Sequence, residues 1–412
     1  MERALDVHID WRGETIPVGR LWARSRSNKQ TSSFEYFQTW RAHPRGFALD
    51  PQMPLTAGTF HAEGLFNAFT DPAPDRWGRS LLLRRERRQA RTEARPARTL
   101  LDIDFLTLVE DQNRMGALRF AEVGGDEFLA RTEQPIPPLI RLARLLSATT
   151  RILKDKESDD DLRLVLAPGA SLGGARPKAA VIDAQGRLAI AKFPGPDDDW
   201  PVPRWEATAM SLARSAGIDV PDFALHIVQN RPVLLMHRFD RDERAHRIPF
   251  ISALTALAGS DGEVRSYLEL LDILRTDGAV PERDAAQLWR RMVFNVLISN
   301  TDDHLRNHGY LRDEGGWVLA PAYDLNPMPI DVKPRNHALT LDEADDASSL
   351  DTVMSVAGRF GLRPEAARSI AAEVGVAVLA WRDVAAEHGL TKAQTERMAS
   401  AFDHVDLAKA VA

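Results

Sequence analysis

Hydrophobic and polar positions predict strands and helices in an order that changes along the chain. Residues 4–23 alternate apolar and polar positions in the manner of a β-hairpin. The stretch 71–75, rich in proline and aspartate, is a typical helix start, and it predicts a helix over residues 76–91. A second helix is predicted over residues 138–150, after a proline-rich linker.

The middle of the chain has the pattern of two hairpins separated by a helix. We predict hairpins over residues 179–193 and 223–239, and between them a helix over residues 204–216 that ends at Gly217. In the last part a hairpin over residues 309–320 is the one strand region expected. The rest of that part has helical spacing, over residues 250–258, 263–275, 281–299, 364–387 and 391–410.

These patterns predict an α+β chain in three regions, with boundaries after residues 130 and 245. The chain has 412 residues, of which 44% are hydrophobic and 27% charged, so it can bury a large core. Its 53 basic and 59 acidic residues give a net charge of −6. The surface as a whole is therefore not that of a basic nucleic-acid-binding protein.

The absence of cysteine narrows the possible chemistry. It excludes disulfides, thiol catalysis, iron–sulfur clusters and cysteine-ligated zinc. The first residues lack the basic and apolar regions of a secretory signal. Near the C-terminus, the apolar stretch Val374–Trp381 is far shorter than the roughly 20 residues that span a bilayer. We therefore expect a cytoplasmic protein without a membrane partner.

Residues 84–98 concentrate positive charge on and after the first predicted helix. One interpretation is a patch that contacts DNA phosphates. The other, which the sequence favours, is a solvated helix face whose basic end complements the helix dipole. Only Glu86 and Glu93 oppose the seven arginines Arg84, Arg85, Arg87, Arg88, Arg91, Arg95 and Arg98.

The polar stretch Asn300–His308 directly follows a strongly apolar predicted helix, which indicates that something binds there. Asp302 and Asn307 have the D-x-x-x-x-N spacing of a kinase catalytic loop. In such a loop the aspartate accepts or orients the proton of the substrate hydroxyl, and the asparagine holds Mg²⁺. Asp324, seventeen residues beyond Asn307, is placed to supply a second oxygen ligand.

Other interpretations of these residues stay open. The other interpretation of Asp324 is a turn residue before Pro327. His304 and His308, four residues apart, suggest a hydrolytic metal site, although the glutamate of a zincin motif is missing. Asp303 adds a second carboxylate, which we expect to solvate the loop.

Three features upstream match the same chemistry. The small-residue loop 170–178 lets backbone amides approach phosphates, although a tight turn would look similar. Lys192 lies among apolar strand residues and needs an anionic partner. Glu206, in the next helix, is a candidate partner, as in the kinase lysine–glutamate pair, or else a first-turn dipole residue. The small-residue loop, the strand lysine, the helix glutamate, the catalytic loop and the metal aspartate follow one another along the chain in the same order as in a kinase.

The chain closely resembles, over almost its whole length, the HipA family of serine/threonine-kinase toxins from bacterial toxin–antitoxin modules. We predict packing and capping roles for the two N-terminal markers of the family, residues 74–79 and 115–120. The segments that carry the resemblance are SLGGARPK (171–178), MHRFDR (236–241), TDDHLRN (301–307), AYDLNP (322–327), PDRWGR (74–79) and MGALRF (115–120).

The resemblance implies a two-lobed protein kinase-like fold. Residues 1–130 correspond to a HipA-type N-terminal subdomain, and residues 131–245 to an ATP-clamping region with a glycine-rich loop and a hinge. Residues 246–412 correspond to a mostly helical C-lobe that carries the catalytic loop and the metal-binding aspartate.

The resemblance also implies a role for each matched residue. Asp302 is the catalytic aspartate, Asn307 and Asp324 hold Mg²⁺, and Ser171 is an autophosphorylated serine. His237 stands where the family often has glutamate, a change that a hinge reading adenine through main-chain groups tolerates. The implied ATP-binding residues are Gly173, Gly174, Ala175, Arg176, Pro177, Lys178, Lys192, His237, Arg238, Phe239, His304, Asn307, Tyr323 and Asp324.

The implied function is an ATP- and Mg²⁺-dependent protein kinase that modifies serine or threonine. Its implied substrate is an aminoacyl-tRNA synthetase, above all glutamyl-tRNA synthetase. The implied partners are a HipB-like helix-turn-helix antitoxin and, through that complex, operator DNA. Two alternatives stay open: a small-molecule phosphotransferase, and a catalytically silent corepressor that acts with a DNA-binding antitoxin.

Overall fold

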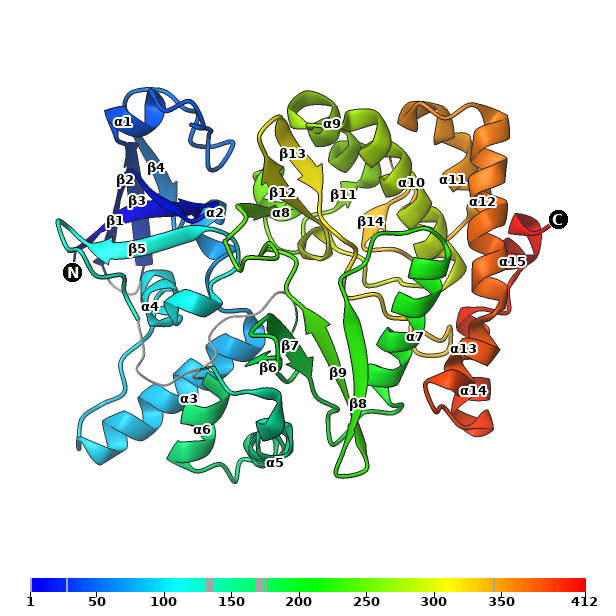
Figure 1. The fold of residues 1–412 in the computed structure, drawn as a ribbon, viewed down its shortest axis with the longest axis horizontal. Coiled ribbons are helices and arrows are strands. Elements are labelled where there is room, and N and C mark those ends of the chain that lie inside the picture. Colours follow the sequence, from blue (N-terminus) through cyan, green and yellow to red (C-terminus); the bar gives the residue numbers. More distant parts are fainter. Residues whose placement is uncertain (1, 27–28, 131–135, 167–173, 175, 344) are drawn as a thin grey trace. The chain divides into compact units, whose positions relative to one another are not determined.

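The computed structural model describes residues 2–26, 29–130, 136–166, 174, 176–343 and 345–412 (Figure 1). The chain divides into two units. Unit 1 comprises residues 1–196, 228–231 and 235–251, and unit 2 comprises residues 197–227, 232–234 and 252–412.

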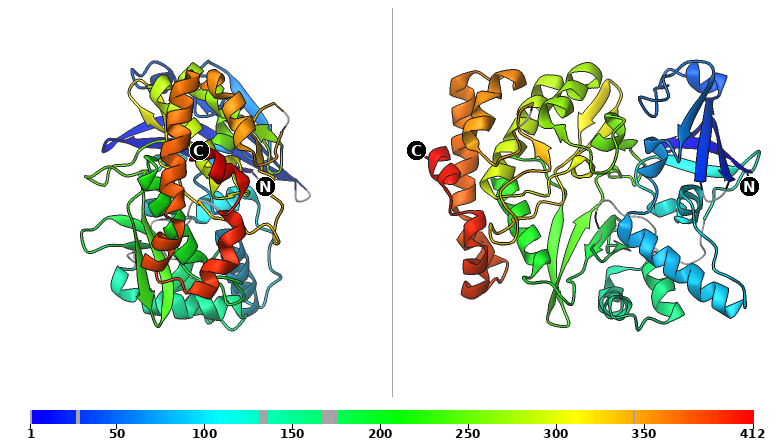
Figure 2. Two further views of the ribbon diagram at one scale, coloured as in Figure 1. Left: turned by 90° about the vertical axis from the view of Figure 1, so that its right-hand side faces the viewer. Right: turned by 180° about the vertical axis from the view of Figure 1, so that it is seen from behind.

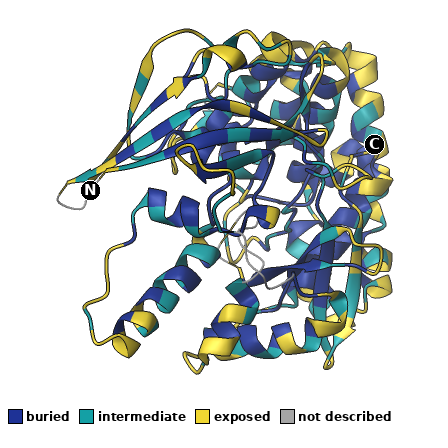
Figure 3. Ribbon diagram, turned by 60° about the vertical axis from the view of Figure 1, so that its left-hand side comes forward, coloured by how far each residue is buried: buried dark blue, intermediate teal, exposed yellow. Residues whose placement is uncertain are grey.

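Unit 1 begins with a five-stranded antiparallel sheet in the order β4-β3-β2-β1-β5 (Figure 1). The hairpin predicted for residues 4–23 is confirmed, because β1 and β2 pair with Ile9 opposite Ile16. One face of these strands is buried and the other is more exposed, as the alternating colours in Figure 3 show. The strands are β1 (Glu2–Trp11), β2 (Glu14–Arg26), β3 (Lys29–Tyr36), β4 (Thr59–Glu63) and β5 (Leu118–Glu122).

Short helices and two longer ones complete the first part of unit 1. The helix predicted over residues 76–91 is α3, and Asp75 caps it by accepting a hydrogen bond from Gly78 N at 2.8 Å. The helix predicted over residues 138–150 begins later and is α5. The helices are α1 (Gln38–Arg41), α2 (Asn67–Thr70), α3 (Arg76–Thr92), α4 (Asp102–Leu108), η1 (Asp111–Asn113), η2 (Leu139–Arg141), α5 (Leu142–Leu153) and α6 (Asp159–Leu166).

The predicted hairpins in the middle of the chain are present. β6 (Lys178–Ile182) and β7 (Leu188–Lys192) pair antiparallel. β8 (Phe223–Val228) and β9 (Arg231–His237) are neighbours in their sheet. The turn between β8 and β9 is formed by Gln229 and Asn230, whose φ angles of 49° and 62° are those of a two-residue hairpin turn.

Unit 2 is mostly helical. Its long helix α12 packs against both α10 and α15 (Figure 2). Gly375 permits the close approach to α15, since a Cβ there would lie 2.9 Å from Ala410 Cβ. The helices are α7 (Val202–Ser215), α8 (Ala253–Ala256), α9 (Tyr267–Asp277), α10 (Pro281–Leu297), η3 (Leu305–Asn307), α11 (Leu350–Ser355), η4 (Ala357–Phe360), α12 (Pro364–Leu379), α13 (Trp381–Glu387), α14 (Lys392–Met398), η5 (Ala399–Ala401) and α15 (Val405–Ala410).

The C-terminal part contains more strands than the sequence pattern predicts. Besides the expected hairpin of β12 (Gly309–Asp313) and β13 (Gly316–Leu319), it has β10 (Phe250–Ser252), β11 (Arg265–Ser266) and β14 (Leu339–Thr340). The helices predicted over residues 250–258 and 263–275 are therefore wrong at their starts. The physical reason is that Ser252 and Ser266 cap α8 and α9, so the residues before each serine stay extended.

Candidate active site

A buried helix leads directly into the predicted catalytic loop. The last turns of α10 are fully buried, and Ser299 just beyond it has a left-handed φ of 52°. This conformation turns the chain away from the helix axis. Asn300 Nδ2 then donates to Asn295 Oδ1 at 3.1 Å and ties the loop back to the helix. The predicted sequence of an apolar helix followed by a polar loop is confirmed.

Asp302 lies at the exposed side of this loop. Its side chain is 68% exposed, and Lys333 Nζ lies 3.7 Å from Oδ1. Its main-chain oxygen accepts a hydrogen bond from Asn307 Nδ2 at 3.0 Å. The backbone of Asp302 is therefore fixed, while its carboxylate is accessible to a hydroxyl group that approaches from outside.

Asp303 is the buried anchor of the loop. Its Oδ2 accepts hydrogen bonds from Tyr267 Oη and, at 2.9 Å, from Asn295 Nδ2, and its Oδ1 lies 2.8 Å from His308 Nε2. Burial favours a raised pKa, but His308 and the hydrogen bonds outweigh it and hold the pKa of Asp303 below its ordinary value. The expectation that Asp303 solvates the loop is wrong. A signal for this site was Asn295, a polar residue inside an apolar helix.

Asn307 has one amide atom engaged and one without a partner. Its side chain is buried, and Nδ2 is bound to Asp302 O. Within the described ranges, its Oδ1 has no hydrogen-bond partner, and neither has Nδ1 of His304. A buried oxygen left unpaired is costly, and an amide oxygen is a hard ligand suited to Mg²⁺. Asn307 therefore fits the metal role that its spacing predicts.

Residues on both sides of Asp324 bind to the loop that contains Asp302 and Asn307, or to the residue just before it. Tyr323 Oη donates to Arg306 O at 2.8 Å, Asn326 N donates to Asn300 Oδ1 at 3.3 Å, and Met328 N donates to Ser299 O at 3.2 Å. Between these contacts, Asp324 has a left-handed φ of 59°. Strained backbone of this kind is concentrated at functional sites. The structure thus brings Asp324 beside the loop of Asp302 and Asn307.

The alternative site built on histidines finds no support in the described part of the chain. There, no group of three or more histidine, cysteine or acidic side chains has the arrangement of a metal site. His308 is buried and directs Nε2 at Asp303, which makes it part of the anchor. His304 stands at the start of η3, where its main-chain oxygen accepts a hydrogen bond from Asn307 N at 2.8 Å.

Two of the residues predicted to bind phosphates, Lys178 and Lys192, lie on the β6–β7 hairpin of unit 1. Lys192 is buried at the end of β7, directly opposite Lys178 at the start of β6. Glu206 is buried in α7 of unit 2, so its ion pair with Lys192 stays a prediction. Gly174 and Arg176 are exposed, with Gly174 at a φ of 80°. Ser171, Leu172, Gly173 and Ala175 lie outside the described residues.

The hinge residues are held by their own unit. His237 Nε2 lies 3.0 Å from Asp183 Oδ2 in the turn region after β6, and Arg238 N donates to Leu188 O at 3.0 Å. The side chain of Arg238 is buried against Asp240, with Nε donating to Oδ1 at 2.6 Å. This side chain is therefore structural, and the predicted recognition of adenine by main-chain groups of 237–239 stays a prediction.

The two N-terminal family markers have the packing and capping roles predicted for them. Gly116 N, in the MGALRF segment, donates to Asp240 Oδ2 at 2.7 Å, and Arg241 Nη1 lies 2.6 Å from the same oxygen. Burial raises the pKa of Asp240, but the positive charges of Arg238 and Arg241 outweigh it and hold this pKa below its ordinary value. In the PDRWGR segment, Asp75 caps α3.

Most arginines of the basic segment 84–98 are neutralised by carboxylates of their own unit. Arg87 and Arg91 are exposed, and in the described ranges no ion pair is formed by either. The solvated-face interpretation is therefore favoured over a DNA patch. The paired distances are 2.6 Å for Arg84–Asp155, 3.1 Å for Arg88–Asp159, 2.6 Å for Arg95–Glu86 and 3.3 Å for Arg98–Asp104.

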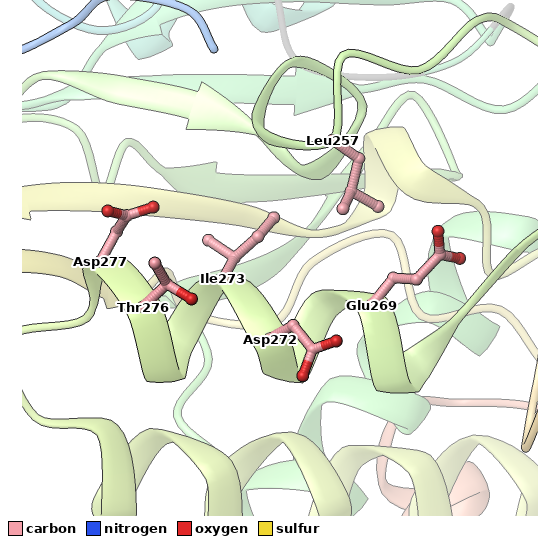
Figure 4. Close-up of a pocket in the computed structure, with 6 residues that line it drawn as sticks. All are labelled: Leu257, Glu269, Asp272, Ile273, Thr276 and Asp277. Carbon is pink, nitrogen blue, oxygen red and sulfur yellow. The ribbon is translucent and has the colours of Figure 1, made fainter.

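A shallow hollow along α9 contains none of the predicted site residues. Figure 4 shows its acidic side chains and Ile273 along the helix, with Leu257 facing them from a loop. One of the carboxylates, Glu269, already pairs with Arg265 at 2.6 Å. The hollow is lined by Leu257, Glu269, Asp272, Ile273, Thr276 and Asp277.

Among the described helices, none is long and apolar enough to cross a membrane.

The chain is similar to known proteins over parts of its sequence. Residues 9–120 match the HipA N-terminal domain. Toxin YjjJ of Escherichia coli is 27% identical over 170 residues, which are 39% of this chain and 38% of YjjJ. Putative kinase Y4mE of Sinorhizobium fredii is 31% identical over 182 residues, which are 38% of this chain and 41% of Y4mE. The chain therefore spans about two fifths of the length of these relatives.

A solved structure shows the fold. The Shewanella oneidensis HipA of a complex with HipB and operator DNA has a TM-score of 0.70 at 17% identity, covering 99% of this chain and 96% of that one. The predicted α+β fold of the HipA type is thereby confirmed. Residues 170–381, more than half of the chain, match the HipA-like C-terminal domain. The chain therefore belongs to the HipA family.

Proposed function

We propose that this chain is a protein kinase that transfers the γ-phosphoryl group of ATP to a serine or threonine hydroxyl. One observation carries the proposal. The exposed carboxylate of Asp302 stands on a loop whose backbone is fixed by Asn307, while Asn307 keeps a buried oxygen without a partner among the described residues. A loop of this kind positions an acceptor and a metal ion side by side.

The chemistry follows from these groups. Asp302 orients the acceptor hydroxyl and takes its proton as the new oxygen–phosphorus bond forms, and the bond to the ADP oxygen breaks. Asn307 Oδ1 and the Asp324 carboxylate would hold Mg²⁺, which neutralises phosphate charge when bound. Lys192 contacts the phosphates, and residues 173–178 cover them. The main chain of residues 237–239 receives adenine, and His304 and Tyr323 border the nucleotide.

The family suggests the biological setting. Within this proposal the chain is a toxin that modifies an aminoacyl-tRNA synthetase, above all glutamyl-tRNA synthetase, and is held by a HipB-like antitoxin on operator DNA. The solved relative, captured with HipB and its operator, supports the partner part of the proposal. A small-molecule phosphotransferase and a silent corepressor remain the competing functions.

Incubation with labelled ATP and Mg²⁺ tests the proposal. We expect label on glutamyl-tRNA synthetase but not on a panel of aminoglycosides, and label on Ser171 of the chain itself when the products are mapped by mass spectrometry. Label on the small molecules alone would favour the phosphotransferase. Absence of any transfer, with intact antitoxin and operator binding, would favour the corepressor.

A further inference from the structure

Two buried lysines face each other on the β6–β7 hairpin. Lys178 and Lys192 are register partners at the open end of the hairpin, and both are buried. Directly opposed residues of an antiparallel pair lie on one face of the sheet, where like charges destabilise the pair. A buried cation also needs an anionic partner. The hairpin therefore requires a carboxylate close to this pair.

Asp75 supplies that carboxylate to Lys178. Asp75 Oδ2 lies 2.7 Å from Lys178 Nζ, and the two side chains are only 9% and 2% exposed. The other oxygen, Oδ1, caps α3 through Gly78 N. The pair is set beside a narrow, mostly apolar cavity, where a low dielectric strengthens the attraction. The apolar lining is formed by Leu81, Leu82, Leu108, Val109, Val165 and Leu166.

The same lysine is held at its main chain and reaches back along the loop. Trp77 Nε1 donates to Lys178 O at 3.0 Å, and Lys178 Nζ donates to Gly174 O at 3.3 Å. The start of α3 is therefore joined to Lys178, at the end of the proposed phosphate loop, by two contacts within unit 1, and a third contact ties Lys178 back to Gly174. These contacts fix the point at which that loop enters β6.

We propose that Asp75 is a positioning residue of the nucleotide site. By neutralising Lys178, it pins the end of the phosphate loop to α3, on the hairpin that also carries Lys192, the lysine proposed to contact phosphates. The ammonium group of Lys178 is then committed to Asp75 and does not itself contact ATP, while the loop that ends at Lys178 covers the phosphates. The inference rests on the proposed kinase function, and it assigns a task to the PDRWGR segment beyond capping.

Calorimetry of ATP binding to the full chain shows whether Lys178 contacts the nucleotide directly or acts only by pairing with Asp75. Asp75→Asn is informative because asparagine caps a helix nearly as well as aspartate, so only the charge is lost. We expect Asp75→Asn and Lys178→Met each to weaken ATP binding by about tenfold, and the double variant to be no weaker than either one. The KM for ATP should rise while kcat at saturating ATP is retained.

Asp102→Asn is the matched control. Asp102 pairs with Arg79 of α3, the helix that Asp75 caps, at 2.7 Å, but it does not pair with Lys178. We expect it to bind ATP like the wild type. The proposal is overturned if Lys178→Met loses far more affinity than Asp75→Asn, because Lys178 would then contact the nucleotide. Wild-type affinity in Asp75→Asn would overturn it as well.

Hydrogen exchange distinguishes this inference from the proposed function. The backbone amides of residues 176–182 should exchange faster in Asp75→Asn than in the wild type. In Asp102→Asn their exchange rates should equal those of the wild type. If the wild type binds no ATP, the kinase proposal fails, and this exchange pattern still decides whether Asp75 pins the loop. Unchanged exchange in Asp75→Asn would show that it does not.

Discussion

Asn307 holds the backbone of Asp302 through its side-chain nitrogen, at 3.0 Å from Nδ2 to the Asp302 oxygen, and keeps its own amide oxygen without a partner among the described residues. One side chain thus connects the residue proposed to orient the acceptor with the place proposed for the metal. Because the two amide atoms have different tasks, different substitutions of Asn307 should separate them.

We predict that Asn307→Leu abolishes the dependence of ATP affinity on Mg²⁺, because leucine offers no oxygen ligand. Asn307→Asp keeps an oxygen at the same position and should retain the dependence while losing the hydrogen bond to Asp302. Titration of ATP into each variant with and without Mg²⁺ measures the effect. Equal Mg²⁺ dependence in wild type and Asn307→Leu would remove Asn307 from the metal site. Asp324→Asn keeps an oxygen but loses the negative charge, so it should weaken Mg²⁺-dependent ATP binding without abolishing the dependence.

Asp303→Asn should destabilise unit 2 by about 3 kcal/mol, because the buried carboxylate that accepts hydrogen bonds from Tyr267 and Asn295 and faces His308 Nε2 is replaced by an amide. The catalytic loop loses its anchor, so phosphoryl transfer should fall as well. Asp261→Asn is the control, since Asp261 pairs with Arg306 of the same loop at an exposed position. Equal denaturation midpoints of the two variants in urea would contradict the anchoring role.

Stability should decrease as the pH falls from 6.5 towards 4. Burial lowers the pKa of His337 to about 4 from an ordinary 6.5, so the folded state keeps this ring neutral while the unfolded state takes up a proton. The contribution is complete above pH 6.5 and lost at about pH 4, and it amounts to about 3 kcal/mol at most. His337→Gln should flatten this dependence in urea unfolding at pH 7 and 4.5. A slope equal to that of the wild type would contradict it.

Neither Arg87→Ala nor Arg88→Ala should change how operator affinity of the antitoxin complex depends on salt. Arg88 is already paired with Asp159, and Arg87 is an exposed residue of a segment whose other charges are mostly paired. Each lost phosphate contact flattens the log–log slope by about one unit. A flattening of that size for Arg87→Ala would show that α3 contacts DNA phosphates.

The sequence predicted what depends on local patterns. The helix that ends before Asn300, the loop spacing of Asp302 and Asn307, and the hairpin that carries Lys192 all follow from periodicity and short-range signals. The short strand before α9 was missed, because helical spacing in that region hides the capping box of Ser266 and Glu269.

Partners that are distant in sequence could not be predicted. Asp303 is anchored by Tyr267, thirty-six residues earlier, and Lys178 is neutralised by Asp75, one hundred and three residues earlier. Spacing carries no information on such pairs, because only the packing of separate elements brings them together. The Lys192–Glu206 pair and the role of Ser171 stay predictions.

The most direct test of the kinase proposal is the rate of phosphoryl transfer by Asp302→Ala beside Asp331→Ala. Asp331 is an exposed carboxylate of unit 2 that pairs with Arg397 at 2.8 Å, which makes it a matched control. With labelled ATP, Mg²⁺ and glutamyl-tRNA synthetase, we predict a loss of about 10²–10⁴-fold for Asp302→Ala, with ATP binding retained, and an unchanged rate for Asp331→Ala. A rate near that of the wild type in Asp302→Ala would contradict the account.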